Sequence, residues 1–580
     1  MLKLLRFLRS FTAAVAAVFI LVFAQSISEL YLPNLMSRIV NIGIVQGDTA
    51  YIMHIGSLML VVTAGGALCA VASSFLSART AMGFGKILRD RLFSHVLTFS
   101  LHEFNKIGTP SLITRTTNDI TQIQMVTMFV MRMIISAPIM FIGGIIMAVS
   151  KDPSLSWVFI GALPLLAAII FAVAAKGLPL FRAMQQKIDA LNRILREGLT
   201  GIRVIRAFNR TGYETRRFQE ANLDLTGTAI KVNRIMALLM PVMMLVMNLT
   251  AVVIVWFGAV RIDRGEMLVG DLMAFLQYSM QIMFSLLMAS MMFIMIPRAQ
   301  ASASRINEVL AVTPAISESR PQPRPADQPV PALRGQVEFR NVTFYYPGAE
   351  EPALEDISFC ARPGEVTAII GGTGSGKTTL INLIPRFYDP TSGSVLVEGT
   401  DVREIPLETL RSKIGLVPQK AVLFSGTAAE NIRFGKEDAA DEEVKRAAEV
   451  AQISDFIASL PEGFQTVIAQ GGVNLSGGQK QRLAIARALI RKPSVYIFDE
   501  SFSALDFKTD AQLRAALRQE TKGATVIIVA QRVNTIMDAD QIIVMDNGHI
   551  VGTGKHSELV KTCPVYREIV ASQLSEEAVA

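Results

Sequence analysis

Residues 365–378 read Glu-Val-Thr-Ala-Ile-Ile-Gly-Gly-Thr-Gly-Ser-Gly-Lys-Thr, an apolar run that leads into a glycine-rich loop. The run 365–370 predicts a buried strand, and the loop matches the spacing G-x-x-x-x-G-K-[ST]. The glycines let backbone N–H groups surround phosphate oxygens, Lys377 neutralises the β- and γ-phosphates, and the Thr378 hydroxyl can reach Mg²⁺. The sequence therefore predicts a P-loop site for ATP and Mg²⁺. The residues assigned to ATP in this stretch are Gly371, Gly372, Thr373, Gly374, Ser375, Gly376, Lys377, Thr378 and Thr379.

A second predicted strand, 495–498, ends in two adjacent acids, Asp499 and Glu500. Asp499 is expected to support Mg²⁺, because carboxylates are hard oxygen ligands for that ion. Two acids at a strand end can also cap a helix, but the neighbouring motifs favour the nucleotide interpretation. We therefore predict that Asp499 binds ATP through the metal.

Residues 475–479 read Leu-Ser-Gly-Gly-Gln and are followed at once by a predicted helix. Two glycines and a helix N-terminus form a favourable site for a phosphate. With this loop, the chain resembles the ATP-binding cassette (ABC) transporter family along essentially its whole length. The resemblance implies that the loop contacts ATP bound by a different cassette. We call it the signature loop, and its residues are Leu475, Ser476, Gly477, Gly478 and Gln479.

Further cassette residues appear in the order typical of the family. The resemblance implies that Tyr346 stacks on adenine, although a core aromatic at a strand end is the plainer interpretation. It also implies that Gln419 senses Mg²⁺ and that Glu500 is the general base for the attacking water, a role that contributes about 10²–10⁴-fold in rate. The segment expected at the cassette interface is Ser503, Ala504, Leu505 and Asp506.

One position departs from the family pattern in a way that bears on mechanism. Gln531 stands where the family usually has a histidine that contacts the γ-phosphate, and an amide cannot become a cation or shuttle a proton. Similar exporters pair one normal ATP site with one weakened site, and the subunit with the altered residue keeps an intact signature loop. We therefore expect a heterodimer with a second half-transporter that has the histidine and an altered loop. The retained Glu500 is also compatible with a homodimer that hydrolyses ATP at both sites.

The composition predicts a membrane protein. Of 580 residues, 51% are hydrophobic, and the mean hydropathy is +0.40. The net charge of +7 does not indicate nucleic acid, because the basic residues concentrate in loops between apolar stretches. Three cysteines, Cys69, Cys360 and Cys563, stand far apart, which argues against a disulfide framework or a zinc site.

Six apolar stretches are long enough to span a bilayer. The two long loops, 77–129 and 176–235, are basic, so both termini are expected in the cytoplasm. By resemblance, these loops carry coupling helices near 107–116 and 209–217. The predicted organisation is an α-helical transmembrane domain (1–310, spans near 11–32, 55–76, 130–149, 155–175, 236–259 and 272–296), a Pro-rich linker (311–335), an α/β P-loop cassette with a helical subdomain (336–571) and a C-terminal tail (572–580).

Polar residues within the spans suggest where cargo could bind. Gln25 and Glu29 share one face of the first helix, and Gln277 and Gln281 share one face of the sixth. Glu29 could receive a cationic amphipathic compound, although hydrogen bonding between helices is the commoner use of such groups.

The resemblance implies an ATP-driven exporter of drugs, lipids or peptides in the cytoplasmic membrane of a bacterium. A siderophore importer with the exporter fold, a homodimeric flippase and an ATP-dependent sensor are the alternatives.

Overall fold

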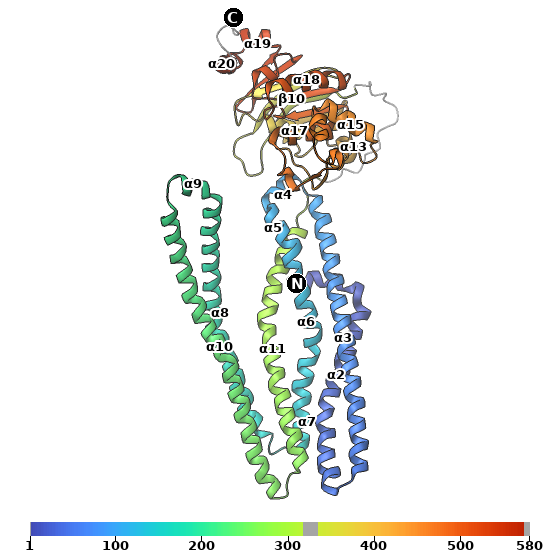
Figure 1. Cartoon of the computed structure of the whole chain (residues 1–580), viewed down its shortest axis with the longest axis vertical. Coiled ribbons are helices and arrows are strands. Elements are labelled where there is room, and N and C mark those ends of the chain that lie inside the picture. The colour runs from blue at the N-terminus through green and yellow to red at the C-terminus, as the bar shows by residue number, and fades with distance from the viewer. Residues whose placement is uncertain (1, 317–333, 574–580) are drawn as a thin grey trace. The chain divides into compact units, whose positions relative to one another are not determined.

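The computed structural model describes residues 2–316 and 334–573, so most of the predicted linker 311–335 lies outside the described residues. The chain divides into two compact units. The first contains residues 1–97 and 109–312, and the second contains residues 98–108 and 313–580. Figure 1 shows the long helices of the first unit and the sheets and short helices of the second.

Six helical stretches of the first unit are long and apolar enough to cross a membrane, which confirms the predicted fold class. They are 42–53 residues long, about twice what a bilayer requires, so they extend well beyond the predicted spans. Their elements are α1 (Leu2–Leu5), η1 (Arg6–Phe11), α2 (Thr12–Arg38) and η2 (Ile39–Ile44); α3 (Thr49–Leu97); α5 (Thr109–Thr114), η3 (Arg115–Asp119), α6 (Ile120–Pro138), η4 (Ile139–Gly143) and α7 (Gly144–Lys151); α8 (Trp157–Thr200); α10 (Thr211–Asp263); and α11 (Val269–Leu310).

Within this unit, α8 and α10 pack side by side and are joined by the short α9 (Ile202–Ala207) (Figure 1). Helix α11 packs against α2, α6 and α7, and its Tyr278 is fully buried. The Tyr278 hydroxyl donates a hydrogen bond to the Leu30 carbonyl oxygen at 3.0 Å, which ties α11 to α2 in an apolar surrounding. This satisfied polar contact fixes how the first and last membrane helices align.

A polar network joins α2, α7 and α11 near their ends. The Lys151 ammonium lies 2.9 Å from the Asp271 carboxylate, which also accepts a hydrogen bond from the Ser37 hydroxyl at 2.7 Å. Beside them, a Cβ atom at Gly270 would lie 2.5 Å from the Ser37 carbonyl oxygen. Only glycine therefore permits this close approach of α11 to α2.

The second unit contains a cassette with two main sheets. Strands β2-β1-β4-β5 form a four-stranded antiparallel sheet, and β12-β11-β3-β10-β9-β6 form a six-stranded sheet that is parallel except for the β11–β12 pair. The strands of the two sheets are β1 (Val337–Phe344), β2 (Leu354–Ala361), β3 (Val366–Gly371), β4 (Ser392–Val397), β5 (Thr400–Asp401), β6 (Ile414–Val417), β9 (Val495–Asp499), β10 (Thr525–Val529), β11 (Gln541–Asp546) and β12 (His549–Gly554).

The six-stranded sheet is buried on both faces, which explains its continuous apolar strands. In β3, Ala368 and Ile370 pack into one core cluster, and Ile369 packs into the other. Strand β10 lies between β3 and β9, so the carboxyl ends of β3 and β9 open onto the same edge. The P-loop and the acidic pair are brought together at this edge.

Further helices cover the sheets and form a helical subdomain, as predicted. The helices and remaining strands of the second unit are α4 (Leu101–Ile107), α12 (Lys377–Leu383), α13 (Leu407–Ser412), β7 (Gly426–Thr427), α14 (Ala428–Arg433), α15 (Asp441–Val450), α16 (Ser454–Ala458), η5 (Gly463–Gln465), β8 (Val467–Ile468), η6 (Gln470–Gly472), α17 (Gly477–Leu489), α18 (Phe507–Glu520), η7 (Val533–Thr535), α19 (His556–Thr562) and α20 (Pro564–Gln573).

Two short helices, α4 and α9, lie just before the segments predicted to contain coupling helices. Helix α4 begins where the Ser100 N–H donates to the Glu103 carboxylate at 2.8 Å, and it ends at Gly108, whose φ is 80°. The predicted segment 107–116 mostly contains α5, and the predicted segment 209–217 is already the start of α10. Residues 98–108 group with the cassette rather than with the transmembrane unit.

The predicted C-terminal tail 572–580 overlaps the end of helix α20. Helix α20 continues through the first two residues of the segment 572–580 and ends at Gln573. Residues 574–580 of that segment lie outside the described residues.

Candidate nucleotide site

The P-loop connects β3 to α12 through a turn that requires glycine. Gly374 and Gly376 have φ values of 86° and 95°, a region in which a side chain is strained. The Lys377 side chain is buried, and its ammonium donates to the carbonyl oxygens of Gly371 at 3.0 Å and Gly372 at 2.7 Å. Burial lowers the pKa of Lys377, and the nearby Glu500 and Asp499 carboxylates oppose that shift. The Lys377 ammonium is thus held by the carbonyl oxygens of the first two glycines of the loop.

Asp499 lies at the end of β9, facing the start of α12. Its carboxylate oxygens are 3.4 and 3.5 Å from the Thr378 hydroxyl. Burial and the neighbouring Glu500 raise the pKa of Asp499 to about 6, although Thr378 and Lys377 act in the opposite direction. Because burial is the larger cause, the ionised carboxylate is costly at this position, and a bound cation would stabilise it.

These residues fit a magnesium ion. The Thr378 hydroxyl, the Asp499 carboxylate and the side-chain oxygen of Gln419 are hard oxygen donors, the kind that Mg²⁺ prefers. The ion would be bound by these groups together with phosphate oxygens, and when bound it would neutralise charge on the phosphates.

Glu500 is bracketed by two amide side chains. Gln419 Nε2 donates to Glu500 Oε2 at 2.6 Å, and Gln531 Nε2 donates to Glu500 Oε1 at 2.7 Å. The Glu500 backbone has a φ of 47°, and its N–H donates to the Val529 carbonyl oxygen of β10 at 3.0 Å. The structure thus brings the three predicted catalytic residues together. The sequence did not predict that Gln531 would bind Glu500, because no motif encodes this side-chain pairing.

Tyr346 lies just beyond β1, near the P-loop helix. Its hydroxyl is 2.9 Å from the Thr379 hydroxyl, and its ring packs edge-on against Phe344 at 5.0 Å and Tyr388 at 5.5 Å. The ring remains 38% exposed, so one surface is free to stack on a base. The geometry is compatible with both the adenine-stacking and the core interpretations, because the ring is packed and partly open.

The signature loop caps its own helix α17. The Ser476 hydroxyl accepts from Gln479 N–H at 3.3 Å, and the Gln479 side chain accepts from Ser476 N–H at 2.8 Å. Among the described residues, no hydrogen bond or ion pair joins 475–479 to the P-loop residues 371–379. The glycine backbone of this loop is therefore not used by the chain's own P-loop.

The predicted interface segment 503–506 connects β9 to α18 beside both motifs. The Ser503 hydroxyl donates to the Glu500 carbonyl oxygen at 2.9 Å, and Asp506 caps α18 by accepting from Thr509 N–H at 2.9 Å. A Cβ atom at Gly478 would lie 3.0 Å from the Ala504 carbonyl oxygen. The segment thus contacts the acidic strand end on one side and the signature loop on the other.

Of the four polar residues predicted inside the spans, the structure brings three together. Gln25 Nε2 donates to Glu29 Oε1 at 2.9 Å, and Gln281 Nε2 donates to the Glu29 backbone oxygen at 3.3 Å. Gln277 is exposed and takes part in none of these bonds. Glu29 therefore has one neutral donor on its carboxylate, and Gln281 serves a contact between helices.

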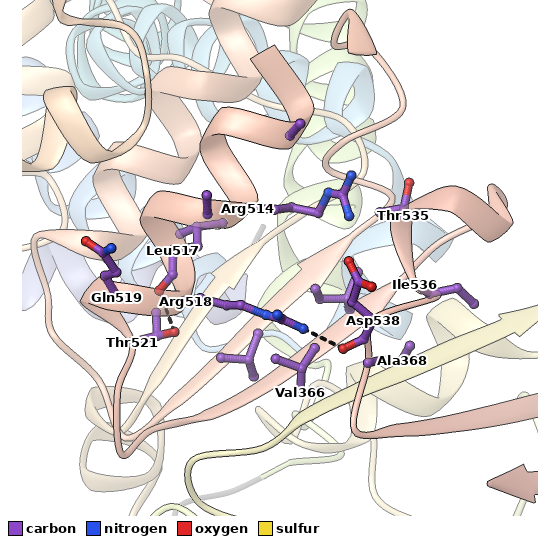
Figure 2. Close-up of a pocket in the computed structure, with 15 residues that line it drawn as sticks. Val366, Ala368, Arg514, Leu517, Arg518, Gln519, Thr521, Thr535, Ile536 and Asp538 are labelled. Atoms are coloured by element: carbon purple, nitrogen blue, oxygen red, sulfur yellow. Dashed lines mark hydrogen bonds between the residues drawn. The ribbon is translucent and has the colours of Figure 1, made fainter. Parts of the chain in front are cut away.

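A cavity elsewhere in the cassette is separate from these motifs. It has a volume of about 460 Å³ and lies between α18 and the strands β3 and β10, with an apolar floor that includes Val366 and Ala368 (Figure 2). Figure 2 shows Arg518 extending toward Asp538, whose carbonyl oxygen accepts its hydrogen bond at 2.5 Å. None of the predicted nucleotide residues lines this cavity, so it is not the ATP site.

Both units match known families. Residues 15–286 match the family described as the ABC transporter transmembrane region, and residues 354–503 match the family described as ABC transporter. An uncharacterised ABC transporter ATP-binding protein of Mycobacterium tuberculosis is 47% identical over 577 residues, covering 99% of this chain and 98% of the relative.

Two further proteins are similar over most of their length. A probable multidrug resistance ABC transporter ATP-binding/permease protein of Bacillus subtilis is 36% identical over 83% of this chain and 82% of its own. The solved structure of a bacterial Atm1-family ABC exporter with ATP bound superposes with a TM-score of 0.79 at 26% identity, covering 97% and 98% of the two chains. The chain therefore belongs to the ABC transporter family, as an exporter-type half-transporter in which one membrane domain is joined to one ATP-hydrolysing cassette that drives export.

Proposed function

We propose that this chain exports hydrophobic or amphipathic compounds as one subunit of a heterodimer with two unequal ATP sites. The observation that carries the proposal is the bond from Gln531 to Glu500 at 2.7 Å. With Gln419 on the other oxygen, both oxygens of the Glu500 carboxylate already accept an amide N–H. A general base must accept a hydrogen bond from water and deprotonate it, so two amide donors that already occupy both carboxylate oxygens favour a slow site.

In the proposed site, different residues bind ATP, hold Mg²⁺ and activate the attacking water. The P-loop N–H groups and Lys377 bind the phosphates, Tyr346 stacks on adenine, and Thr378, Asp499 and Gln419 hold Mg²⁺. Glu500 orients the attacking water and accepts its proton. The Gln531 amide has two N–H donors, of which one bonds to Glu500, but it supplies no positive charge in the transition state.

The signature loop supports the need for a second cassette. Residues 475–479 make no contact with the chain's own P-loop through hydrogen bonds or ion pairs of the described residues, and their sequence is intact. In the first unit, α9 has no buried residue, and Val204 and Phe208 on and beside it are largely exposed. We propose that the loop and α9 both contact the partner subunit, which has the histidine and an altered signature loop.

The cargo is proposed from the membrane unit and one relative. The apolar helices leave Glu29 as a carboxylate with a single neutral donor, which suits the positive end of an amphipathic compound. The Bacillus subtilis relative is named a probable multidrug resistance transporter, which agrees with an amphipathic compound as cargo. We place the protein in the cytoplasmic membrane of a bacterium with both termini in the cytoplasm.

Expression of the chain alone and together with the product of the neighbouring reading frame tests the heterodimer. We expect the chain alone to show little ATPase activity and the co-expressed pair to purify as a complex with substantially higher activity per cassette. The measurement is ATP turnover of both preparations in the same lipid. A stable homodimer with full activity would favour the second candidate, a symmetric exporter, which the retained Glu500 permits.

A further inference from the structure

We propose that Gln573, the last residue of α20, is a positioning residue for ATP hydrolysis at this chain's own site. Its side-chain amide fixes the backbone of the segment that carries Gln531. The inference rests on the proposed catalytic role of Glu500, and it assigns a function to the C-terminal helix of the cassette.

The amide of Gln573 bonds to the backbone on both sides of Arg532. Its Nε2 donates to the Gln531 carbonyl oxygen at 2.7 Å, and its Oε1 accepts from the Val533 N–H at 2.9 Å. Donor and acceptor of one rigid, planar group are thus matched to an acceptor and a donor two residues apart. This pairing of opposite roles also determines which end of the amide is nitrogen.

Both backbone groups need a partner from outside the segment. The sheet ladder ends with the Ala530 N–H, which donates to the Ile369 carbonyl oxygen at 3.1 Å. Val533 begins the short helix η7, and the first N–H groups of a helix have no acceptor within it. Gln573 supplies the acceptor for Val533 and a donor for Gln531, so the segment between β10 and η7 is tied to α20.

Helix α20 is itself firmly anchored. Tyr566 and Val570 are fully buried in the same core cluster as Val533 and Ile536. Gln573 follows Val570 by three residues and therefore lies on the same helix face. Gln573 is itself exposed, at the end of a helix that Tyr566 and Val570 anchor in the core.

Gln573 acts on the Glu500 carboxylate through Gln531. With its carbonyl oxygen fixed, Gln531 places its Nε2 2.7 Å from Glu500 Oε1. Without Gln573, the backbone of Gln531 gains freedom, and the Glu500 carboxylate loses one of the two donors that orient it. The P-loop and Tyr346 lie on other segments, so ATP binding should not change.

The test follows hydrolysis at this chain's own site in the assembled, full-length transporter. Vanadate-dependent trapping of a photoreactive ATP analogue, resolved by chain, reports that site separately from its partner. Because the bond from Gln531 is proposed to slow Glu500, Gln573→Ala should raise the saturating trapping rate by about three- to tenfold, the worth of one hydrogen bond, at an unchanged half-saturating ATP concentration, and a lowered rate would contradict the proposal. In a Gln531→Ala background, Gln573→Ala should have no further effect, because its action passes through Gln531.

Three variants make the result decisive. Ser572→Ala is the matched control and should behave as wild type. Within residues 2–316 and 334–573, the Ser572 hydroxyl bonds to the Ile569 carbonyl oxygen of its own helix alone. Gln573→Glu keeps the acceptor for the Val533 N–H and loses the donor to the Gln531 carbonyl oxygen, so its effect on the trapping rate should be intermediate. It also tests the proposal if the alanine variant folds poorly. Glu500→Gln tests the proposed role of Glu500 separately from that of Gln573.

If Glu500→Gln traps nucleotide at the wild-type rate, the proposed role of Glu500 fails. If Glu500→Gln blocks trapping while Gln573→Ala and Gln573→Glu match wild type, the positioning role alone is overturned. An equal effect of Gln573→Ala with and without Gln531 would also overturn it, because the helix would then act through general stability.

Discussion

Replacement of Gly477 by aspartate in this chain should lower ATP turnover of the assembled transporter by about 10²–10³-fold, the cost of losing preorganised backbone donors at a reacting phosphate. The signature loop is proposed to complete the partner's hydrolytic site, where a carboxylate would repel the phosphates. A Cβ atom at Gly477 meets only the Ala504 side chain, at 4.0 Å, so the variant should fold. Steady-state phosphate release measures the effect.

The same variant should leave this chain's own nucleotide affinity unchanged, because the loop makes no hydrogen bond to residues 371–379 in the described structure. Gly477→Ala, which adds volume without charge, should have a smaller effect and serves as the control. Loss of ATP binding by this chain in Gly477→Asp would contradict the assignment of the loop to the partner.

Glu500→Gln should lower hydrolysis at this chain's own site by about 10²–10⁴-fold while ATP remains bound, because the amide cannot accept the proton of the attacking water. The variant also changes one acceptor for Gln419 and Gln531 into a donor, which breaks one of the two bonds to the carboxylate. Chain-resolved vanadate trapping measures the loss.

Glu351→Gln is a suitable control for that variant, since Glu351 is exposed and lies in the loop before β2. It should trap nucleotide at the wild-type rate. If Glu500→Gln also retained that rate, the base would have to be another group, and the account of the site would fail.

The sequence predicted the elements of the fold better than their extent. Six apolar stretches and the strand–loop–helix order at Lys377 were enough for the architecture, because both signals are local. The helices continue far beyond the bilayer through polar sequence, which hydropathy does not detect. The start of α4 depends on the Ser100–Glu103 cap and its end on Gly108, which no apolar pattern indicates.

The sequence predicted which residues form the site but not which of their side chains bond to each other. Motifs placed Gln419, Glu500 and Gln531 near one nucleotide, yet the bond between Gln531 and Glu500 depends on the left-handed backbone of Glu500 and on its link to β10. Gln573 was assigned to a tail, because the sequence gives no sign that its amide meets a backbone segment 40 residues away. Such contacts arise from tertiary packing and have no local pattern.

We propose that this chain's own ATP site, which contains the P-loop 371–379, is the slower of the transporter's two ATP sites. The most direct test of this proposal is ATP turnover by the assembled transporter with Lys377→Ala in this chain, compared with alanine at the matching lysine of the partner. The account predicts that Lys377→Ala lowers turnover by less than about tenfold, while the partner's substitution nearly abolishes it. Equal abolition by the two substitutions would contradict the account and show that both sites are required alike.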